Sequence, residues 1–324
     1  MMKAIVYTKY GSPDVLQLKE VEKPKPKNDE VLVKVHAASV NPLDWHNMRG
    51  EPFLQRQESG LFKPEKQILG ADVAGRVEAI GNRVTKFQPG DEVYGDLYWH
   101  GFGAFAEYVC VPEHSCALKP VNLTFEEAAA VPQGAFTALH ALRDQGEIQP
   151  GQKVLINGAS GGVGTFTVQI AKYFGAEVTG VCSTRNLELV RSIGADHVID
   201  YTQENFTQHG QQYDLIVDIA ANHSLSDLRN SLRPKGVCVV VGFSTMLHMI
   251  QVRLLAPRIS KNGDKKMGML LPSENTEDLV FMKELLETGK VVPVIDRTYD
   301  FGETSEAIRY LEEGHARGKV VISM

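Results

Sequence analysis

The chain has 324 residues, of which 43% are hydrophobic and 23% are charged, and its formal net charge is −6. This composition is ordinary for a globular protein, and the length predicts two domains. Because no basic cluster and no long apolar run occurs, we expect no nucleic-acid partner and no membrane span.

The first part of the chain, up to about residue 120, is rich in glycine and proline and predicts short strands. Apolar and polar residues alternate in the segments 30–40, 73–80 and 104–111, and a Pro-Gly-Asp turn in residues 87–94 leads into a further strand. This pattern predicts a β barrel or a curled sheet. The four cysteines form no C-x-x-C pair, which favours a reducing, cytoplasmic location.

After Leu123 the pattern changes. Thr124 and Glu127 fit a capping box, and a helix is predicted over residues 128–142 with an interruption near Pro132 and Gly134. From Lys153 onward, strands and helices alternate. Strands are predicted at 154–156, 178–181, 197–199, 215–219 and 237–241, and helices at 165–173, 187–193 and 225–232. Such alternation indicates a parallel sheet covered on both faces.

The last part of the chain predicts a helix at 276–287, strands at 291–295 and 319–323, and a helix at 304–313 between these strands. If the last strands return to the first part, residues 1–123 and 291–324 form one discontinuous domain. Residues 124–290 then form a second domain inserted in it. Residues 243–271 contain an apolar region, for which an oligomer contact, a substrate wall and a core helix all remain open. It is formed by Met246, Leu247, Met249, Leu254 and Leu255.

A glycine-rich turn stands between the predicted strand 154–156 and the predicted helix 165–173. Its sequence fits G-x-G-x-x-G with Ala159 in first place, followed by Ser160, Gly161, Gly162, Val163 and Gly164. Small residues let the backbone approach a pyrophosphate, and the helix N-terminus attracts its negative charge. The turn therefore predicts a dinucleotide site, against the alternative of a tight turn without a ligand.

The end of the second strand of such a fold selects the dinucleotide, because it lies near the adenosine ribose. Here Ser183, Thr184 and Arg185 follow the strand, without a carboxylate. Hydroxyls and a guanidinium suit the 2′-phosphate of NADP, so we expect NADPH rather than NADH. Alternatively, Ser183 only caps the next helix and Arg185 points to solvent. Tyr201 is a candidate second phosphate ligand, or else packs the domain edge.

With these features the chain resembles the medium-chain dehydrogenase/reductase superfamily, in particular its zinc-free quinone oxidoreductase and enone reductase branch. The segments that carry the resemblance are 39–44 (SVNPLD), 70–75 (GADVAG), 86–93 (KFQPGDEV), the glycine-rich turn and 194–201 (GADHVIDY). The resemblance implies an α/β protein with a GroES-like β-barrel domain and a Rossmann-type, doubly wound parallel sheet.

Zinc-dependent members of the superfamily carry a cysteine early in the first domain and a Gly-His-Glu further on. The corresponding positions here read Asn41-Pro42-Leu43-Asp44 and Gly70-Ala71-Asp72. Both soft ligands are missing, and so is a lobe with four closely spaced cysteines. We therefore expect no metal site.

The resemblance also implies site residues. Asn41 matches the family asparagine beside the nicotinamide, although an Asx turn before Pro42 is the alternative. His46 stands where relatives carry a lysine near the cofactor, and a surface histidine is the alternative. Thr137 matches a threonine that touches the nicotinamide, or it bonds back to its own helix.

Three further residues complete the expected site. Tyr98 falls where a loop lines the substrate cleft, and we group it with Asn41 and His46 as candidate catalytic residues. Val241 and Gly242, at the end of the predicted strand 237–241, are expected beneath the nicotinamide.

The implied function is NADPH-dependent reduction of the activated C=C bond of α,β-unsaturated carbonyls or quinones, by hydride transfer without a metal. Small electrophilic carbonyl compounds or quinones are then the substrates, and we expect a homodimer. Two alternatives stay open: a zinc-independent alcohol or carbonyl oxidoreductase, and a non-catalytic NADPH-binding protein.

Overall fold

The computed structural model describes residues 1–53, 56–242, 246–261, 264–271 and 273–324. They form two compact units, one of residues 1–133, 274–289 and 293–324, the other of residues 134–273 and 290–292. Helix α9 (Thr276–Glu287) is grouped with the first unit, whereas the predicted boundary at residue 290 puts it with the second. Its anchors explain the grouping: Tyr94 donates a 2.6 Å hydrogen bond to the carbonyl of Leu279, and Asn122 donates one to the carbonyl of Leu286.

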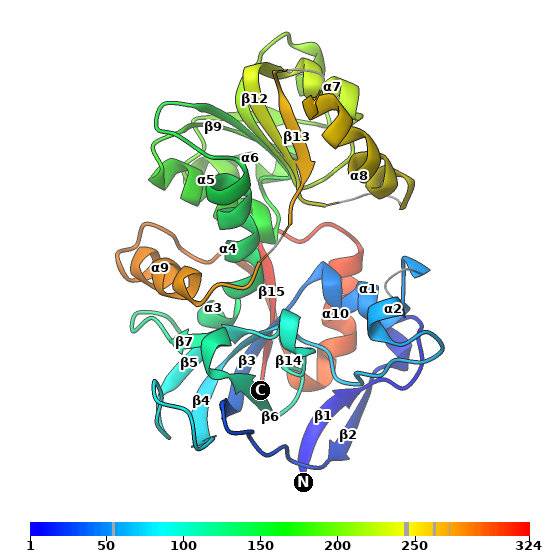
Figure 1. Ribbon diagram of the computed structural model, residues 1–324, viewed down its shortest axis with the longest axis vertical. Helices are drawn as coiled ribbons and strands as arrows, with labels where there is room; N and C mark the ends of the chain where they lie inside the picture. Colours follow the sequence, from blue (N-terminus) through cyan, green and yellow to red (C-terminus); the bar gives the residue numbers. More distant parts are fainter. Residues whose placement is uncertain (54–55, 243–245, 262–263, 272) are drawn as a thin grey trace. The chain divides into compact units, whose positions relative to one another are not determined.

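The first unit contains two sheets (Figure 1). Strands β1 and β2 form an antiparallel pair, and a larger sheet runs in the order β14-β15-β3-β4-β5-β7 with β6 also paired to β3. The bounds are β1 Met2–Val6, β2 Gln17–Val21, β3 Glu30–Val40, β4 Asp72–Ile80, β5 Glu92–Asp96, β6 Tyr108–Pro112, β7 Cys116–Leu118, β14 Ile295–Asp300 and β15 Lys319–Ser323. One core is enclosed by the larger sheet, because alternate residues of its strands are buried together.

The last strand returns to the first part of the chain, as the discontinuous arrangement requires. Strand β15 pairs antiparallel with β3, and Val320 lies opposite Val40. The strand predicted at 291–295 is wrong, because β14 begins only at Ile295. Pro293 lacks an N–H for a sheet, and the N–H of Val292 donates instead to the side chain of Gln169.

The helices of the first unit are short, apart from α9. They are α1 Pro42–Arg49, α2 Arg56–Ser59, α3 Phe125–Ala129 and α10 Thr304–Glu312. The predicted capping box is present: the N–H of Thr124 donates to the carboxylate of Glu127, and the N–H of Glu127 donates to the hydroxyl of Thr124. The helix predicted over 128–142 is divided, because α3 ends before Pro132 and α4 (Pro132–Leu139) begins there.

The second unit is a six-stranded sheet in the order β10-β9-β8-β11-β12-β13, and every neighbouring pair is parallel. This is the 3-2-1-4-5-6 order of a doubly wound dinucleotide fold, so the predicted fold class is confirmed. The bounds are β8 Lys153–Asn157, β9 Glu177–Cys182, β10 His197–Asp200, β11 Tyr213–Asp218, β12 Leu232–Val240 and β13 Lys266–Met269.

Helices α5 (Gly162–Tyr173), α6 (Leu187–Ser192), α7 (Leu225–Asn230) and α8 (Met246–Lys261) cover this sheet (Figure 1). Helix α8 falls in the apolar region whose role was open. It contributes Val252 and Ala256 to the core, whereas Leu254 and Leu255 are exposed in the single chain. Phe243 and the side chains of residues 246–248 lie outside the described part. No helix among the described residues has the length and hydropathy needed to cross a membrane.

Candidate functional site

The glycine-rich turn joins β8 to α5, as predicted. Helix α5 begins at Gly162, with Gly161 as its extended N-cap residue. A Cβ on Gly164 would lie 2.1 Å from the carbonyl oxygen of Gly158, whereas a Cβ on Gly161 would meet only that same oxygen, at 3.7 Å. Gly164 is therefore needed for packing of the helix on the turn, and Gly161 leaves the backbone open to a ligand. The first N–H groups of α5 have no partner within the helix and suit an anion.

This turn lies where the strand order of the sheet reverses, between β8 and β11. Dinucleotides bind at such a switch point. The side chain of Asn157, at the end of β8, donates hydrogen bonds of 2.7 Å to Asp218 and 2.9 Å to Asn222. The two strand ends are thus tied together beneath the turn.

A buried asparagine connects the glycine-rich turn to the end of β9. The Nδ2 of Asn186 donates to the hydroxyl of Ser160 at 3.0 Å and to that of Ser183 at 3.2 Å. Asn186 is 5% exposed, and its Oδ1 accepts no hydrogen bond from the described residues. A buried acceptor without a partner at this position fits a dinucleotide, whose ribose hydroxyls are donors. Sequence reasoning missed Asn186; its signal was an asparagine directly before a predicted helix.

The residues at the end of β9 do not fit the alternative in which Ser183 only caps the next helix. Ser183 precedes a 3-10 turn at Thr184–Asn186, but its side chain makes no capping hydrogen bond. Arg185 is exposed on that turn. Tyr201 is 55% exposed, and its N–H donates to the carbonyl of Cys182. These residues therefore lie around one strand end.

A carboxylate does lie beside this strand end, contrary to the expectation from β9 alone. Asp200, the last residue of β10, is the register partner of Cys182, and it accepts hydrogen bonds from the hydroxyls of Thr184 and Thr202. These hydrogen bonds, that of Thr184 first, hold the pKa of Asp200 below its ordinary value. The hydroxyl of Thr184 thus donates its proton to a carboxylate, and a phosphate contact of Thr184 stays a prediction.

Thr137, Val241 and Gly242 lie near the same edge of the sheet. A Cβ on Gly134 would lie 3.0 Å from Phe166 and 3.1 Å from the carbonyl oxygen of Gly162. Helix α4 therefore packs on the start of α5, and Thr137 follows Gly134 on the same helix face. The N–H of Val241 donates to the carbonyl of Asp218, next to the switch point.

In the first unit, Asn41 belongs to a buried polar network. Its Oδ1 accepts a 2.6 Å hydrogen bond from Lys319 Nζ, and its Nδ2 donates a 2.9 Å hydrogen bond to Asp72. Its N–H donates to the carboxylate of Asp44. The side chain of Asn41 is thus used in the network, and the helix cap before Pro42 is made by the backbone and Asp44.

Asp72 is the centre of this network. Its Oδ2 lies 3.0 Å from Lys319 Nζ and accepts a hydrogen bond from the hydroxyl of Ser39, while its Oδ1 accepts one from the N–H of Gln133. The exposed fractions of the Asp72 and Lys319 side chains are 0% and 3%. The charge of the carboxylate is therefore neutralised by an ammonium group, so the residues present at the position of the superfamily's zinc ligands do not fit a catalytic zinc ion.

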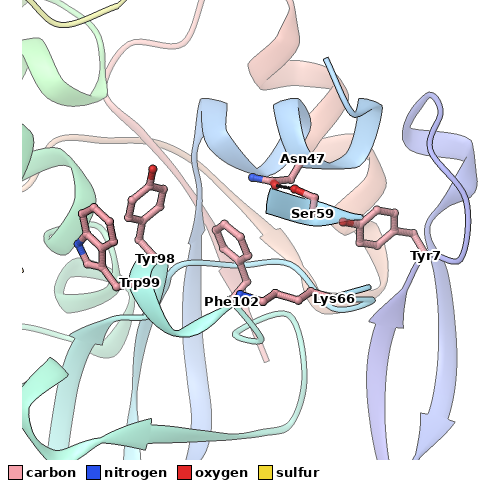
Figure 2. Close-up of a pocket in the computed structure, with 7 residues that line it drawn as sticks. All are labelled: Tyr7, Asn47, Ser59, Lys66, Tyr98, Trp99 and Phe102. Carbon is pink, nitrogen blue, oxygen red and sulfur yellow. Dashed lines mark hydrogen bonds between the residues drawn. The ribbon is translucent and has the colours of Figure 1, made fainter. Parts of the chain in front are cut away.

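A cavity of the first unit is lined partly by aromatic side chains (Figure 2). The ring centroids of Tyr98 and Trp99 lie 4.8 Å apart in an edge-to-face arrangement. The role of Tyr98 in lining a substrate cleft stays a prediction. The hydroxyl of Ser59 donates a 2.6 Å hydrogen bond to Asn47. The lining residues are Tyr7, Asn47, Ser59, Lys66, Tyr98, Trp99 and Phe102. Sequence reasoning missed Tyr7, Asn47, Ser59 and Lys66, because they come from separate segments without a shared motif.

His46 does not line this cavity. It lies on α1, its Nδ1 is 2.8 Å from the carbonyl oxygen of Glu51, and its ring packs against that of Trp45. Burial lowers the pKa of His46, which favours a neutral imidazole.

Comparison with known families identifies the chain. Residues 27–121 match the family described as alcohol dehydrogenase GroES-like domain, and residues 193–322 match the family described as zinc-binding dehydrogenase. A relative from Solanum lycopersicum, 2-methylene-furan-3-one reductase, is 38% identical over 99% of this chain and 79% of its own length.

The chain belongs to the medium-chain dehydrogenase/reductase superfamily.

Two further matches are named as an alkenal/one oxidoreductase and a quinone oxidoreductase. The NADPH-dependent alkenal/one oxidoreductase of Arabidopsis thaliana is 35% identical over 99% of this chain and 79% of its own length. The structure of the quinone oxidoreductase from Coxiella burnetii superposes with a TM-score of 0.87 at 32% identity, covering 100% of this chain and 99% of that one. The predicted superfamily, its fold and its oxidoreductase class are confirmed.

Proposed function

We propose that this protein uses NADPH to reduce the activated C=C bond of α,β-unsaturated carbonyls, or quinones, by hydride transfer without a metal. The observation that carries the proposal is the buried Asp72–Lys319 pair with Asn41, which takes the place of zinc ligands. The names of the tomato relative, a 2-methylene-furan-3-one reductase, and of the Arabidopsis relative, an NADPH-dependent alkenal/one oxidoreductase, support it.

A metal-free site suits this reaction better than alcohol oxidation. NADPH, when bound, would supply a hydride for the β carbon of the substrate, and a side chain or water would supply a proton for the α carbon. Negative charge develops meanwhile on the carbonyl oxygen, and hydrogen-bond donors suffice to stabilise it. Alcohol oxidation, in contrast, needs a group that takes up the hydroxyl proton, a role that zinc supports through the bound oxygen.

The cavity of the first unit offers the groups that such a substrate needs. The aromatic rings of Tyr98, Trp99 and Phe102 suit a flat conjugated molecule. Lys66 brings an ammonium group, and burial raises the pKa of Tyr7, which keeps its phenol protonated as a donor. We assign Lys66 and the tyrosine hydroxyls to stabilise the developing oxyanion. The assignments of Asn41 and His46 to the nicotinamide side of the site remain predictions.

The preference for NADPH rests on Arg185, with Ser183 and Tyr201 beside it. An exposed guanidinium at this strand end suits bidentate contact with a 2′-phosphate. The negative charge of Asp200 would repel a phosphate, but its carboxylate accepts hydrogen bonds from two threonine hydroxyls. The homodimer and the cytoplasmic location likewise stay predictions.

The test follows the loss of NADPH absorbance with a panel of enones, quinones and aldehydes, before and after exhaustive chelation. We expect turnover of enones or quinones, unchanged by chelation. Turnover of aldehydes alone would favour a carbonyl oxidoreductase instead. Tight NADPH binding without turnover of any electrophile would indicate a non-catalytic binding protein. Activity that is lost on chelation and restored by zinc would contradict the metal-free mechanism.

A further inference from the structure

Three side chains with metal-ligating atoms gather around one point in the first unit, apart from the Asp72 network. Nε2 of His100 lies 2.7 Å from Oε1 of Glu274, and Nε2 of His114 lies 3.6 Å from the same oxygen. The two imidazole rings approach edge to face, with centroids 5.2 Å apart. All three ligand atoms lie within 4.8 Å of one another.

The three residues come from separate segments that are fixed by other contacts. His100 ends the 3-10 turn Tyr98–His100, and His114 lies in the 3-10 turn Glu113–Ser115. Glu274 precedes α9, where the hydroxyl of Thr276 donates to the carbonyl of His114. The cluster is therefore formed by the fold itself.

The spacing and the donor atoms suit a zinc-class ion. Zinc binds imidazole nitrogen and carboxylate oxygen at about 2.0–2.2 Å, so ligand atoms around a tetrahedral ion are about 3.3 Å apart. Small side-chain rotations bring the present distances to that value. Two imidazoles with one carboxylate favour zinc, cobalt, nickel or copper over magnesium and calcium.

The surroundings of the cluster agree with such a site. The hydroxyl of Ser115, which is 3% exposed, donates a hydrogen bond to the carboxylate of Glu274. A hydrogen bond of this kind orients a metal-ligating carboxylate. The side chains of His100, His114 and Glu274 are 25%, 54% and 29% exposed, so an ion can enter from solution and a water molecule can fill the fourth position.

We propose that His100, His114 and Glu274 form a binding site for one zinc-class divalent cation per chain, separate from hydride transfer. The ion joins the turn that carries Tyr98 and Trp99 to the segment that begins α9. It has no part in the chemistry proposed above, because Asp72 and Lys319 already form a neutral pair.

The experiment titrates the metal-stripped full-length protein with Co²⁺, followed by its visible absorption, and with Zn²⁺, followed by calorimetry. We expect one ion per chain. Affinity falls more than about 100-fold in His100→Ala and in His114→Ala, and about 10–100-fold in Ser115→Ala, as is typical of groups that orient ligands. The matched control is His197→Ala, which removes a histidine paired with Glu177 and leaves the affinity unchanged.

Two outcomes overturn the proposal: no saturable binding to the wild-type protein, or equal affinity in His100→Ala and in the control. Circular dichroism of each variant confirms folding. If a variant does not fold, the cobalt spectrum of the wild-type protein decides, because octahedral, water-like absorption contradicts bound imidazoles. NADPH binding and enone turnover, measured on the same stripped samples, test the proposed function separately, since neither needs this ion.

Discussion

Lys319 Nζ lies 3.0 Å from Asp72 Oδ2, and both side chains are buried. Lys319 comes from the last strand of the chain and Asp72 from the first residue of β4. A buried charge is tolerated when it is paired and hydrogen-bonded. Here Asn41 bridges the two partners, so the position of this candidate catalytic amide depends on an ion pair between distant segments.

The first prediction concerns this pair. Lys319→Met leaves the Asp72 carboxylate buried without its cation, and we expect the free energy of unfolding to fall by about 3–5 kcal/mol. The double variant Asp72→Asn/Lys319→Met recovers most of that loss. Denaturant unfolding at neutral pH measures both. Lys27→Met, which removes an exposed pair with Glu30, leaves stability unchanged; a double variant no more stable than Lys319→Met alone would refute the pairing argument.

The second prediction separates two glycines of the β8–α5 turn. Gly164→Ala places a Cβ 2.1 Å from the carbonyl oxygen of Gly158, so we expect a large loss of thermal stability. Gly161→Ala introduces no such clash, and its backbone is extended. We expect Gly161→Ala to fold normally but to bind NADPH at least about tenfold more weakly, because its methyl group meets the pyrophosphate. Unchanged NADPH affinity in a folded Gly161→Ala would remove the turn from the cofactor site.

The third prediction tests dinucleotide preference. Arg185→Ala weakens NADPH binding about tenfold or more and leaves NADH binding nearly unchanged, because only NADPH carries the 2′-phosphate. Fluorescence titration with both dinucleotides measures the difference. Arg191→Ala, an exposed arginine on α6, serves as the control. An equal loss for both dinucleotides would exclude the phosphate role of Arg185.

The fourth prediction concerns how the free energy of unfolding changes with pH. Burial, with a further contribution from the Asp72 carboxylate, raises the pKa of Asp96 from 3.8 to about 7. The folded protein then binds this proton more tightly than the unfolded chain, so this contribution to stability is present at acidic pH and is lost as the pH rises from about 4 to about 7.

Asp96→Asn removes this contribution to the pH dependence. We expect the stability of the variant relative to the wild-type protein to be higher at pH 8 than at pH 5, because the asparagine amide does not ionise. The side-chain amide of Gln133, which donates to Asp96, can rotate so that its oxygen accepts a hydrogen bond from the new amide. Urea unfolding at several pH values gives the comparison. Asp29→Asn, an exposed site, keeps the wild-type slope. A variant with the wild-type slope at Asp96 would show that this carboxyl is ionised throughout.

The fifth prediction addresses the cavity. Lys66→Met removes the ammonium group assigned to the developing oxyanion, and we expect kcat with an enone to fall at least about tenfold. Its KM changes less, because the aromatic walls remain. Lys63→Met, a nearby exposed lysine, is the matched control. Equal rates in the two variants would place the oxyanion elsewhere.

Local patterns in the sequence predicted much of the fold. Period-two alternation located β3, and the helix signal located α9 at the bounds that the structure shows. The glycine-rich turn was recognisable because its chemistry is contained in six consecutive residues. Strand β13 was missed, since it has only four residues, KMGM, and none of them is β-branched or aromatic.

The site was predicted less completely, because its decisive contacts are not local. Asn186 gains its role only when α6 and the glycine-rich turn meet. Asp200 lies close enough to accept a hydrogen bond from Thr184 only because β10 pairs with β9, and the sequence after β9 carries no sign of that pairing. The partner of Asp72 lies 247 positions away, and no spacing rule connects them.

The pairing of β15 with β3 has a consequence for the order of events during synthesis. Residues 134–273 leave the ribosome before the strand that completes the earlier unit has been translated. The nucleotide-binding fold can therefore form first, before Lys319 has been synthesised and can pair with Asp72. The side chain of Asn41 therefore reaches its final hydrogen-bonding position late in folding, after the five-residue strand β15 has been synthesised.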